Sequence, residues 1–163
     1  LRWIILTLVR GDAARAARVS EIEGDVWTVP AHRIKGREGQ VKDFRVPLSA
    51  AALDIVEEAR AAGHDLLFPG NRGTPITAVA IEKYLNRIGE LGRPHGFRTS
   101  FRTWAQDHDV SYDVAETILG HTIGGRVERT YARSDLLDWR RVVMESWAGY
   151  VTGGQAMVIA SKN

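Results

Sequence analysis

The sequence has 163 residues, enough for one domain with a hydrophobic core, and its 44% hydrophobic and 26% charged residues are ordinary for a globular protein. It contains no cysteine, which excludes disulfides, zinc–thiolate sites and cysteine nucleophiles. A net charge of +2 permits a nucleic-acid partner without demanding one, so the positions of the charges carry more information than their sum.

The first residues of the chain indicate whether it carries a membrane span or a signal peptide, and whether it is a fragment. The longest apolar run, residues 4–9, is too short to cross a membrane and lacks the cleavage site of a signal peptide. The sequence opens at Leu1, inside an apolar helical pattern and without a residue suited to N-capping. We therefore expect a fragment that further residues precede in the full-length protein, and we expect no membrane partner.

The first half of the chain predicts a helix followed by a small sheet. Residues 1–9 have the apolar pattern of a buried helix, and the Ala- and Arg-rich stretch up to Arg18 favours a second, short helix. Residues 26–30 and 44–48 are short β runs separated by glycines suited to a turn, which indicates an antiparallel sheet. The most basic stretch of the chain lies between and beside these strands and contains Arg33, Lys35, Arg37, Lys42 and Arg45.

Two helices are expected in the middle of the chain. Ser49 can cap a helix that runs to about Ala62, where Gly63 can end it. Thr77 can cap the next helix, which a Gly-Arg-Pro sequence at residues 92–94 interrupts. The apolar residues of this second helix recur at helical spacing and are Ile81, Tyr84, Leu85 and Ile88.

Three more helices are expected toward the C-terminus. One starts near Arg98, and a short one covers about residues 113–119, with Asp113 and Glu116 at the spacing of a capping box and Gly120 just after its end. A longer helix starts at Ser134 and carries apolar residues at helical spacing. Together the patterns predict one α+β domain that is mainly α-helical and contains a small three-stranded antiparallel sheet.

Several side chains suited to phosphate chemistry are spread along the chain. These residues are Arg10, Lys35, His95, Arg98, His121 and Tyr131. Taken singly, each has an ordinary structural explanation. An arginine at a helix C-terminus usually interacts with the helix dipole, a hairpin lysine is usually solvated, and a tyrosine is more often a core or surface residue than a nucleophile. Only their combination and order are specific.

In chain order these residues read R…K…H-x-x-R…L-G-H…Y, and this pattern resembles the active site of the tyrosine recombinases, the family of the phage-type integrases. Residues 6–10 resemble the helix end that carries the family's first arginine, and residues 45–49 resemble the strand after its lysine. Residues 27–30 and 102–104 are similar to the integrases of genomic islands and satellite phages. The resemblance covers roughly residues 5–150, and it identifies the chain as the C-terminal catalytic domain, residues 1–163.

One position departs from the family pattern, and one assignment has an alternative. The family usually has an acidic residue three positions after the first arginine, where this chain has Ala13. Asp12, one residue earlier, is a possible substitute. Loss of the acidic residue would be expected to lower the activity. The segment between the two strands is long, so Lys42 is an alternative to Lys35 as the family's lysine. Lys35 is preferred because it follows its strand directly.

The resemblance implies a role for each residue. Arg10 and Arg98 would hold the scissile phosphate, because guanidinium groups are permanently charged donors that match phosphate oxygens, and His121 would add a hydrogen bond. Tyr131 would attack the phosphorus and form a 3′-phosphotyrosine bond. His95 is the candidate base for the tyrosine, since free tyrosine has a pKa of about 10.

The remaining roles concern the leaving group and the duplex. Lys35 is the candidate acid for the 5′ oxygen, and Arg37 and Lys42 are candidate DNA contacts. Because cations of the protein would stabilise the phosphate charge, we expect neither a metal nor ATP nor any other cofactor. The sequence likewise shows no H-E-x-x-H motif.

The resemblance also implies an assembly. The substrates would be double-stranded DNA attachment sites, with an N-terminal DNA-clamping domain absent from this sequence. Four protomers would exchange strands, with the C-terminal tail of each docked on a neighbour, and DNA-bending and excisionase proteins are possible partners. The function would be integration or excision of a prophage or genomic island in the bacterial cytoplasm, at the nucleoid.

Three other interpretations compete with this one. A type IB topoisomerase shares the chemistry but relaxes supercoils, and the H-x-x-R and L-G-H contexts favour the integrases. A catalytically degenerate DNA-binding homologue is suggested only by Ala13. A helical interaction domain without a DNA role would require all of the ordered motifs to be coincidental.

Overall fold

The structure is a computed structural model that describes residues 1–36, 41–121 and 135–154. The described part of the chain is mainly α-helical, as predicted. Its α-helices are α1 (Arg2–Thr7), α2 (Gly11–Arg15), α3 (Ala50–Ala61), α4 (Ala78–Arg87), α5 (Gly96–Asp107), α6 (Tyr112–Ile118) and α8 (Leu137–Thr152). Its 3₁₀ turns are η1 (Val19–Glu21), η2 (Ala31–Arg33) and η3 (Asn71–Gly73).

A small antiparallel sheet follows the first two helices, which confirms the predicted fold class. Its strands are β1 (Ile22–Glu23), β2 (Val26–Val29) and β3 (Phe44–Pro47), in the order β1-β2-β3. Trp27 is opposite Ile22 on one side and Val46 on the other. Trp27 and Val29 are buried, whereas their neighbours in β2 are half-buried, so one face of the strand packs on the core.

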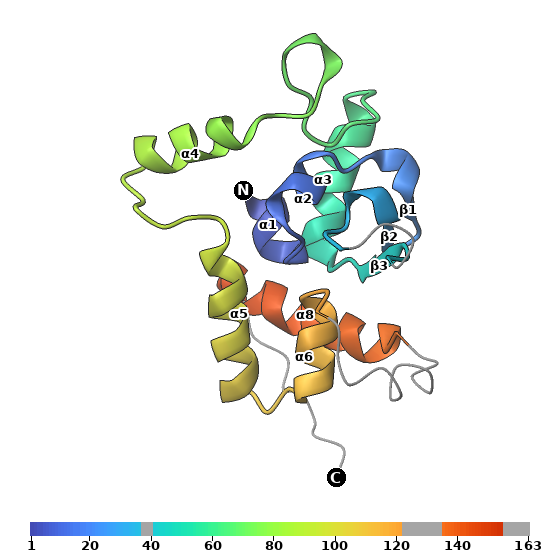
Figure 1. The fold of residues 1–163 in the computed structure, drawn as a ribbon, viewed down its shortest axis with the longest axis vertical. Helices are drawn as coiled ribbons and strands as arrows, with labels where there is room; N and C mark the ends of the chain where they lie inside the picture. The colour runs from blue at the N-terminus through green and yellow to red at the C-terminus, as the bar shows by residue number, and fades with distance from the viewer. Residues whose placement is uncertain (37–40, 122–134, 155–163) are drawn as a thin grey trace.

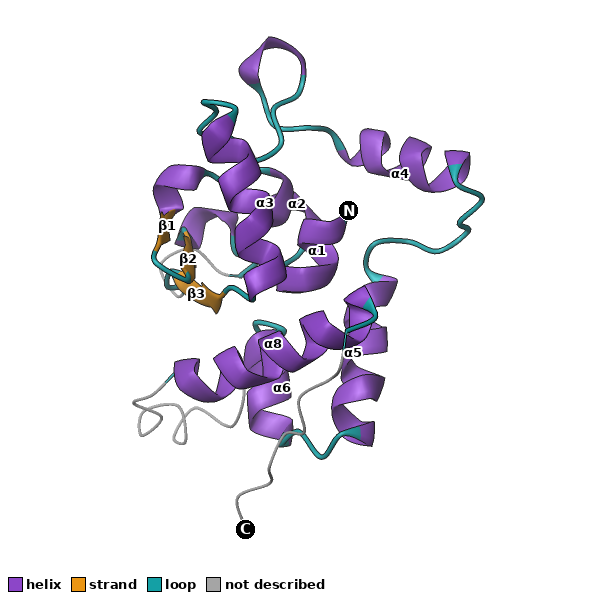
Figure 2. Ribbon diagram, turned by 180° about the vertical axis from the view of Figure 1, so that it is seen from behind, coloured by secondary structure: helices purple, strands orange, loops and turns teal. Residues whose placement is uncertain are grey.

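The elements form two groups with one helix set apart (Figure 1). One group contains α1, α2, α3 and the sheet, and the other contains α5, α6 and α8. The view from behind shows the same division, with α4 projecting from the side of the molecule between two extended segments (Figure 2). Of the residues of α4, only Ile81 and Leu85 are buried.

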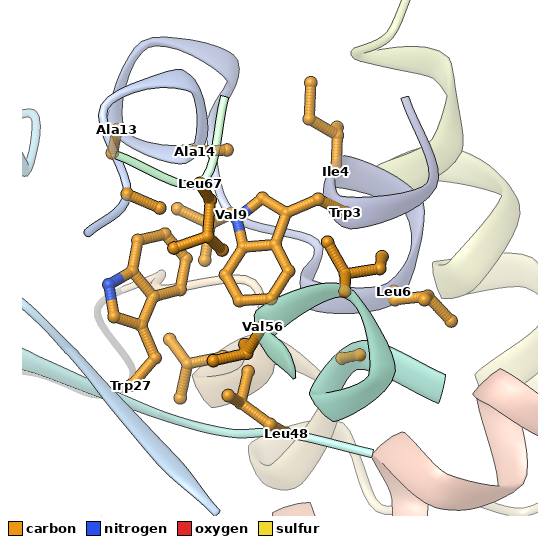
Figure 3. Close-up of a cluster of buried hydrophobic side chains, with 14 of the residues drawn as sticks. Trp3, Ile4, Leu6, Val9, Ala13, Ala14, Trp27, Leu48, Val56 and Leu67 are labelled. Carbon is orange, nitrogen blue, oxygen red and sulfur yellow. The ribbon is translucent and has the colours of Figure 1, made fainter. Parts of the chain in front are cut away.

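The core of the first group is built around two tryptophans. The ring centroids of Trp3 on α1 and Trp27 on β2 are 5.1 Å apart. Val56 of α3 and Leu67 pack beside them, so the core joins both early helices to the sheet and to α3 (Figure 3). Aromatic side chains of this size bury large apolar areas, which makes this pair a main source of stability.

A second hydrophobic cluster joins α5, α6 and α8. Phe101 and Trp104 of α5 and Trp147 of α8 belong to it. Leu8, at the end of α1, belongs to this cluster rather than to the first one. Trp147 also donates a hydrogen bond from Nε1 to the carbonyl of Ile5, so α1 is held by both groups.

The helix ends confirm some of the predicted caps and contradict another. The hydroxyl of Thr77 accepts a hydrogen bond from the Ala80 amide at 3.2 Å, as predicted, and Gly63 has the positive φ of a residue that ends a helix. Ser49 lies at the N-cap of α3, but its buried hydroxyl has no hydrogen-bond partner within the described part of the chain. The Ala50 amide instead donates to Glu145 of α8 at 3.0 Å.

The predicted capping box of α6 is wrong. The helix begins at Tyr112 after Ser111, and no side chain caps it. Glu116 is buried and points away from the helix start, because its carboxylate binds other groups. Gly120 has a φ of 63° just after the helix, as predicted. The C-terminal helix α8 begins at Leu137, whereas Ser134, where it was expected to start, lies outside the described residues.

Within the described ranges, no helix is both long enough and apolar enough to cross a membrane.

Candidate active site

A cleft of about 450 Å³ lies where the two groups of elements meet. Its walls come from the junction of α1 and α2, the segment between β2 and β3, and the ends of α5, α6 and α8. Asp43 and Asp135 are its acidic lining residues. The basic lining residues are Arg10, Arg33, Lys35, Lys42, Arg45, Arg98 and Arg140. Cations therefore outnumber carboxylates around the described cleft, which suits a polyanionic ligand.

The backbone at the end of α1 has an unusual conformation. Leu8 has a φ of 57°, in the left-handed region that a leucine rarely occupies and that costs about 1 to 2 kcal/mol. Its amide donates a helical hydrogen bond to the Ile4 carbonyl at 2.9 Å, and its left-handed conformation then ends the helix. The carbonyl of Leu8 accepts a hydrogen bond from Arg98, so this strained turn is held by the site itself. Arg10, two residues later, is half-buried at the N-cap of α2 and lines the cleft.

Arg98 joins three distant segments of the chain. Its side chain reaches from α5 to the carbonyls of Leu8 and Leu119, and its Nη2 lies 3.2 Å from Nε2 of His121. Burial, and to a smaller extent the charge of Arg10, lower the pKa of Arg98 to about 10, while Glu116 acts in the opposite direction. Arg98 therefore stays charged at neutral pH.

His121 is placed by the end of α6. The Gly120 amide donates to the Thr117 carbonyl and the His121 amide donates to the Glu116 carbonyl, each at 2.9 Å, which is the Schellman pattern. Glycine is required at this turn because its φ is positive. The motif folds His121 back beside the helix. There its Nδ1 lies 2.8 Å from Glu116 Oε2.

Both candidate lysines line the cleft. Lys35 and Lys42 are exposed on either side of the loop between β2 and β3, and residues 37–40 of this loop lie outside the described part. A Cβ added to Gly36 would lie 2.3 Å from the Val41 side chain, so the two ends of the loop pack closely. The geometry admits either lysine as the proton donor, and the choice of Lys35 remains a prediction.

The remaining predicted residues have different positions. His95 precedes α5, one turn before Arg98, where it is exposed and is not one of the described residues that line the cleft. Tyr131 and Arg37 lie outside the described residues. Of the predicted site residues, the structure thus brings together Arg10, Lys35, Lys42, Arg98 and His121 around the cleft.

Asp12 does not take the place of the acidic residue that the family usually has at the position of Ala13. Ala13 is buried and lines the cleft, whereas the Asp12 carboxylate is 93% exposed and pairs with Arg15 at 2.5 Å. Among the described residues, no three His, Cys, Asp or Glu side chains gather closely enough to hold a metal ion.

Sequence reasoning missed two residues of the site. Glu116 was assigned to a capping box, although a glycine at the end of a helix is a signal that the residue four positions before the glycine can meet the residue that follows it. Arg140 is 1% exposed, lines the cleft, and donates to the carbonyl of Arg45 while its guanidinium carbon lies 4.8 Å from the centroid of the Phe44 ring. Its signal was an arginine on the apolar stripe of a helix, between Leu136 and Val143.

Comparison with known proteins matches this combination of fold and cleft to one family. The model of the phage integrase family matches residues 1–136. The prophage integrase IntA of Escherichia coli K12 is 34% identical over 157 residues, which cover 91% of this chain and 37% of IntA. The integrase of enterobacteria phage P4 is 32% identical, with 90% of this chain and 38% of that protein covered.

A solved structure has the same fold. It is the XerH site-specific recombinase bound to its difH substrate in a pre-cleavage complex, with a TM-score of 0.53 and 21% identity. The match covers 81% of this chain and 44% of XerH.

The chain belongs to the phage integrase family, whose members are the tyrosine recombinases that the sequence pattern resembles. It spans somewhat more than a third of the length of the integrases that it matches.

Proposed function

We propose that this chain is the catalytic domain of a site-specific recombinase that breaks and rejoins DNA through Tyr131. The observation that carries the proposal is the convergence of Arg10, Lys35, Arg98 and His121 on one basic cleft. These four residues come from segments up to 111 positions apart in the sequence. Residues so far apart in the sequence would not be expected to meet in one cleft by coincidence.

The cleft has the charges that phosphoryl transfer requires. Attack on a phosphodiester builds negative charge on the non-bridging oxygens, and aimed donors stabilise it by about 2.7 to 4 kcal/mol each. Toward described residues, Arg98 uses three of the five guanidinium N–H groups, so two remain for a phosphate. Arg10 lies near enough to lower the pKa of Arg98, so an anion between them would relieve a mutual repulsion.

The proposed reaction is a reversible exchange of one ester for another. The Tyr131 oxygen bonds to the scissile phosphorus, the bond from phosphorus to the 5′ oxygen breaks, and Lys35 supplies the proton that this oxygen takes up. His95, which is exposed at the start of α5, is the proposed acceptor of the tyrosine proton. Because the phosphotyrosine bond stores the energy of the broken bond, a 5′ hydroxyl from a second duplex can reverse the step without ATP.

The wider proposal concerns the DNA and the assembly. Exposed Lys35 and Lys42 at the rim of the cleft suit contacts with the duplex backbone, whose phosphates dominate protein–DNA affinity. The relatives are about two and a half times as long as this chain, which leaves room for a further, DNA-clamping domain in the complete protein. A tetramer, tail docking between protomers and accessory proteins remain predictions of the family resemblance.

The first experiment traps the covalent intermediate. The full-length protein is incubated in EDTA with a nicked duplex that carries the attachment core of its own mobile element, and adducts are separated on a denaturing gel. We expect a protein–DNA adduct that is absent from the Tyr131→Phe variant. This result would establish the nucleophile, the reaction and its independence of divalent metals together.

The control is sequence-specific binding by the same two proteins. If both bind the core DNA and neither forms an adduct, the proposal fails, and a degenerate DNA-binding homologue with Ala13 as its defect becomes the better interpretation. Relaxation of supercoiled plasmid without exchange between two sites would instead indicate a topoisomerase.

A further inference from the structure

Glu116 is a buried carboxylate that contacts the site, and the roles proposed above do not explain it. Its side chain is 8% exposed, and it does not line the cleft. Oε2 lies 2.8 Å from His121 Nδ1, and Oε1 lies 2.7 Å from Arg102 Nη1. The Arg102 N–H bonds are not aimed at Oε1, which has no proper hydrogen bond from the described residues, so the directed contact of Glu116 is with His121.

The two partners of His121 determine which ring nitrogen carries its proton. A guanidinium group can only donate, so Nε2 accepts from Arg98 Nη2 at 3.2 Å. A carboxylate can only accept, so Nδ1 donates to Glu116. Together Arg98 and Glu116 select the neutral tautomer that is protonated at Nδ1. In this tautomer the Nε2 lone pair faces Arg98, which lines the cleft.

Glu116 holds His121 at two points. Its backbone carbonyl accepts the amide of His121 in the Schellman motif, and its side chain accepts Nδ1–H. Because Nδ1 contacts Glu116 and Nε2 contacts Arg98, the ring has little freedom to rotate about its side-chain torsions. The acidic residues that line the cleft do not duplicate this contact, because Asp43 accepts from the Ala31 amide and Asp135 pairs with Arg45.

We propose that Glu116 is a positioning residue that fixes the tautomer and orientation of His121, so that Nε2 is presented to the scissile phosphate. The proposal rests on the function proposed above. To donate to a phosphate, Nε2 must first gain a proton, and the resulting imidazolium is stabilised by a carboxylate on its opposite nitrogen. Both the accepting and the donating state of Nε2 thus keep Nδ1–H on Glu116.

The test uses the full-length protein and the variants Glu116→Ala and Glu116→Gln. Asp113→Asn is the matched control, because Asp113 is an exposed carboxylate one turn earlier on the same helix. The first readout needs no DNA and no activity. A two-bond ¹H–¹⁵N correlation spectrum of the histidine rings, at a pH where His121 is neutral, reports which nitrogen of His121 is protonated.

We expect His121 to be protonated at Nδ1 in the wild type and in Asp113→Asn, and to be a mixture of tautomers in Glu116→Ala. Glu116→Gln should keep the Nδ1–H form, because Arg102 is partly exposed and can turn away from the amide. The second readout is the rate of adduct formation at saturating DNA. We expect Glu116→Ala to lower it by about 10- to 100-fold, by analogy with the loss of the hydrogen-bond partner of a metal-bound histidine, with DNA affinity unchanged.

The proposal is overturned if wild-type His121 is protonated at Nε2, or if Glu116→Ala keeps both the tautomer and the cleavage rate of the control. If Glu116→Ala does not fold, Glu116→Gln decides. An Nδ1–H tautomer in that variant supports the proposal, and an Nε2–H tautomer contradicts it. Since the tautomer is measured without DNA, failure of the proposed recombination activity would leave this result interpretable.

Discussion

At the scale of single residues, the site depends on arginines that do two things at once. Arg98 supplies charge to the cleft and also satisfies the carbonyls of Leu8 and Leu119, which end two different helices. Arg140 similarly supplies charge while it binds the carbonyl of Arg45 and packs on Phe44. Removing such a residue should therefore affect both catalysis and folding, because buried carbonyls without donors destabilise a protein.

The variant Arg98→Lys separates charge from geometry. A lysine keeps the positive charge, but its single ammonium group cannot reach both carbonyls and a phosphate. We expect a loss of about 1 to 3 kcal/mol in the free energy of unfolding, from the carbonyls left unpaired. Adduct formation should fall by about 100- to 1,000-fold.

Chemical denaturation and the adduct gel measure the two effects. Arg60→Lys is the control, because Arg60 is a partly exposed arginine on α3 whose ion pair with Glu57 is at the surface. Near-normal cleavage by Arg98→Lys would show that charge alone suffices at this position.

At the scale of elements, helix ends in this protein are satisfied by neighbouring helices as well as by their own sequence. The first amide of α3 is bound by Glu145 from α8, which is 95 positions away in the sequence. The residue that the sequence pattern favours for this task, Ser49, is buried without a partner among the described residues. The docking of α8 therefore contributes directly to the start of α3.

This arrangement predicts that two alanine substitutions will change stability in the reverse order to that expected from the sequence, where Ser49 is the cap. Glu145→Ala should lower the free energy of unfolding by about 1 kcal/mol, the usual effect of losing an N-cap. Ser49→Ala should be neutral or slightly stabilising, because it removes a buried hydroxyl that has no described partner. Urea denaturation of the two variants measures both values. A larger loss for Ser49→Ala than for Glu145→Ala would restore Ser49 as the cap.

At the scale of the whole molecule, stability is unevenly distributed. The two hydrophobic clusters include residues from α1, α3, α5, α6 and α8, whereas α4 contributes only Ile81 and Leu85 and projects from the body (Figure 1). Elements with few buried apolar residues open at lower free energy than the rest of a protein. We infer that, of the described helices, α4 opens more readily than the longer helices α3 and α8, which contribute more buried residues to the two clusters.

Hydrogen exchange tests this inference. Amides of α4 should exchange at least about tenfold faster than amides of α3 and α8, because a difference of about 1.4 kcal/mol in opening free energy changes exchange tenfold. Peptide-level mass spectrometry on the DNA-free protein resolves these helices. Equal protection of α4 and α3 would contradict the uneven distribution. Faster exchange in α5 or α6 than in α4 would place the weak point in the site itself.

The sequence alone determined the fold class and singled out several of the residues that line the cleft. Apolar spacing marked the helices, and the capping by Thr77 and the turn at Gly120 were readable because they depend on neighbouring residues only. The ordered motif selected Arg10, Lys35, Arg98 and His121 before any geometry was known. Local patterns carry these features because each depends on a few residues that are close in sequence.

Only the tertiary structure decided which residues meet. Glu116 has the spacing of a capping residue, yet it is turned inward to His121, because the end of α6 folds back on itself and Arg102 approaches from α5. Arg98 reaches Leu8, and Glu145 reaches α3, across 90 and 95 positions of the sequence. Such contacts depend on how helices dock, which is decided by the packing of the two clusters as a whole and not by any local pattern.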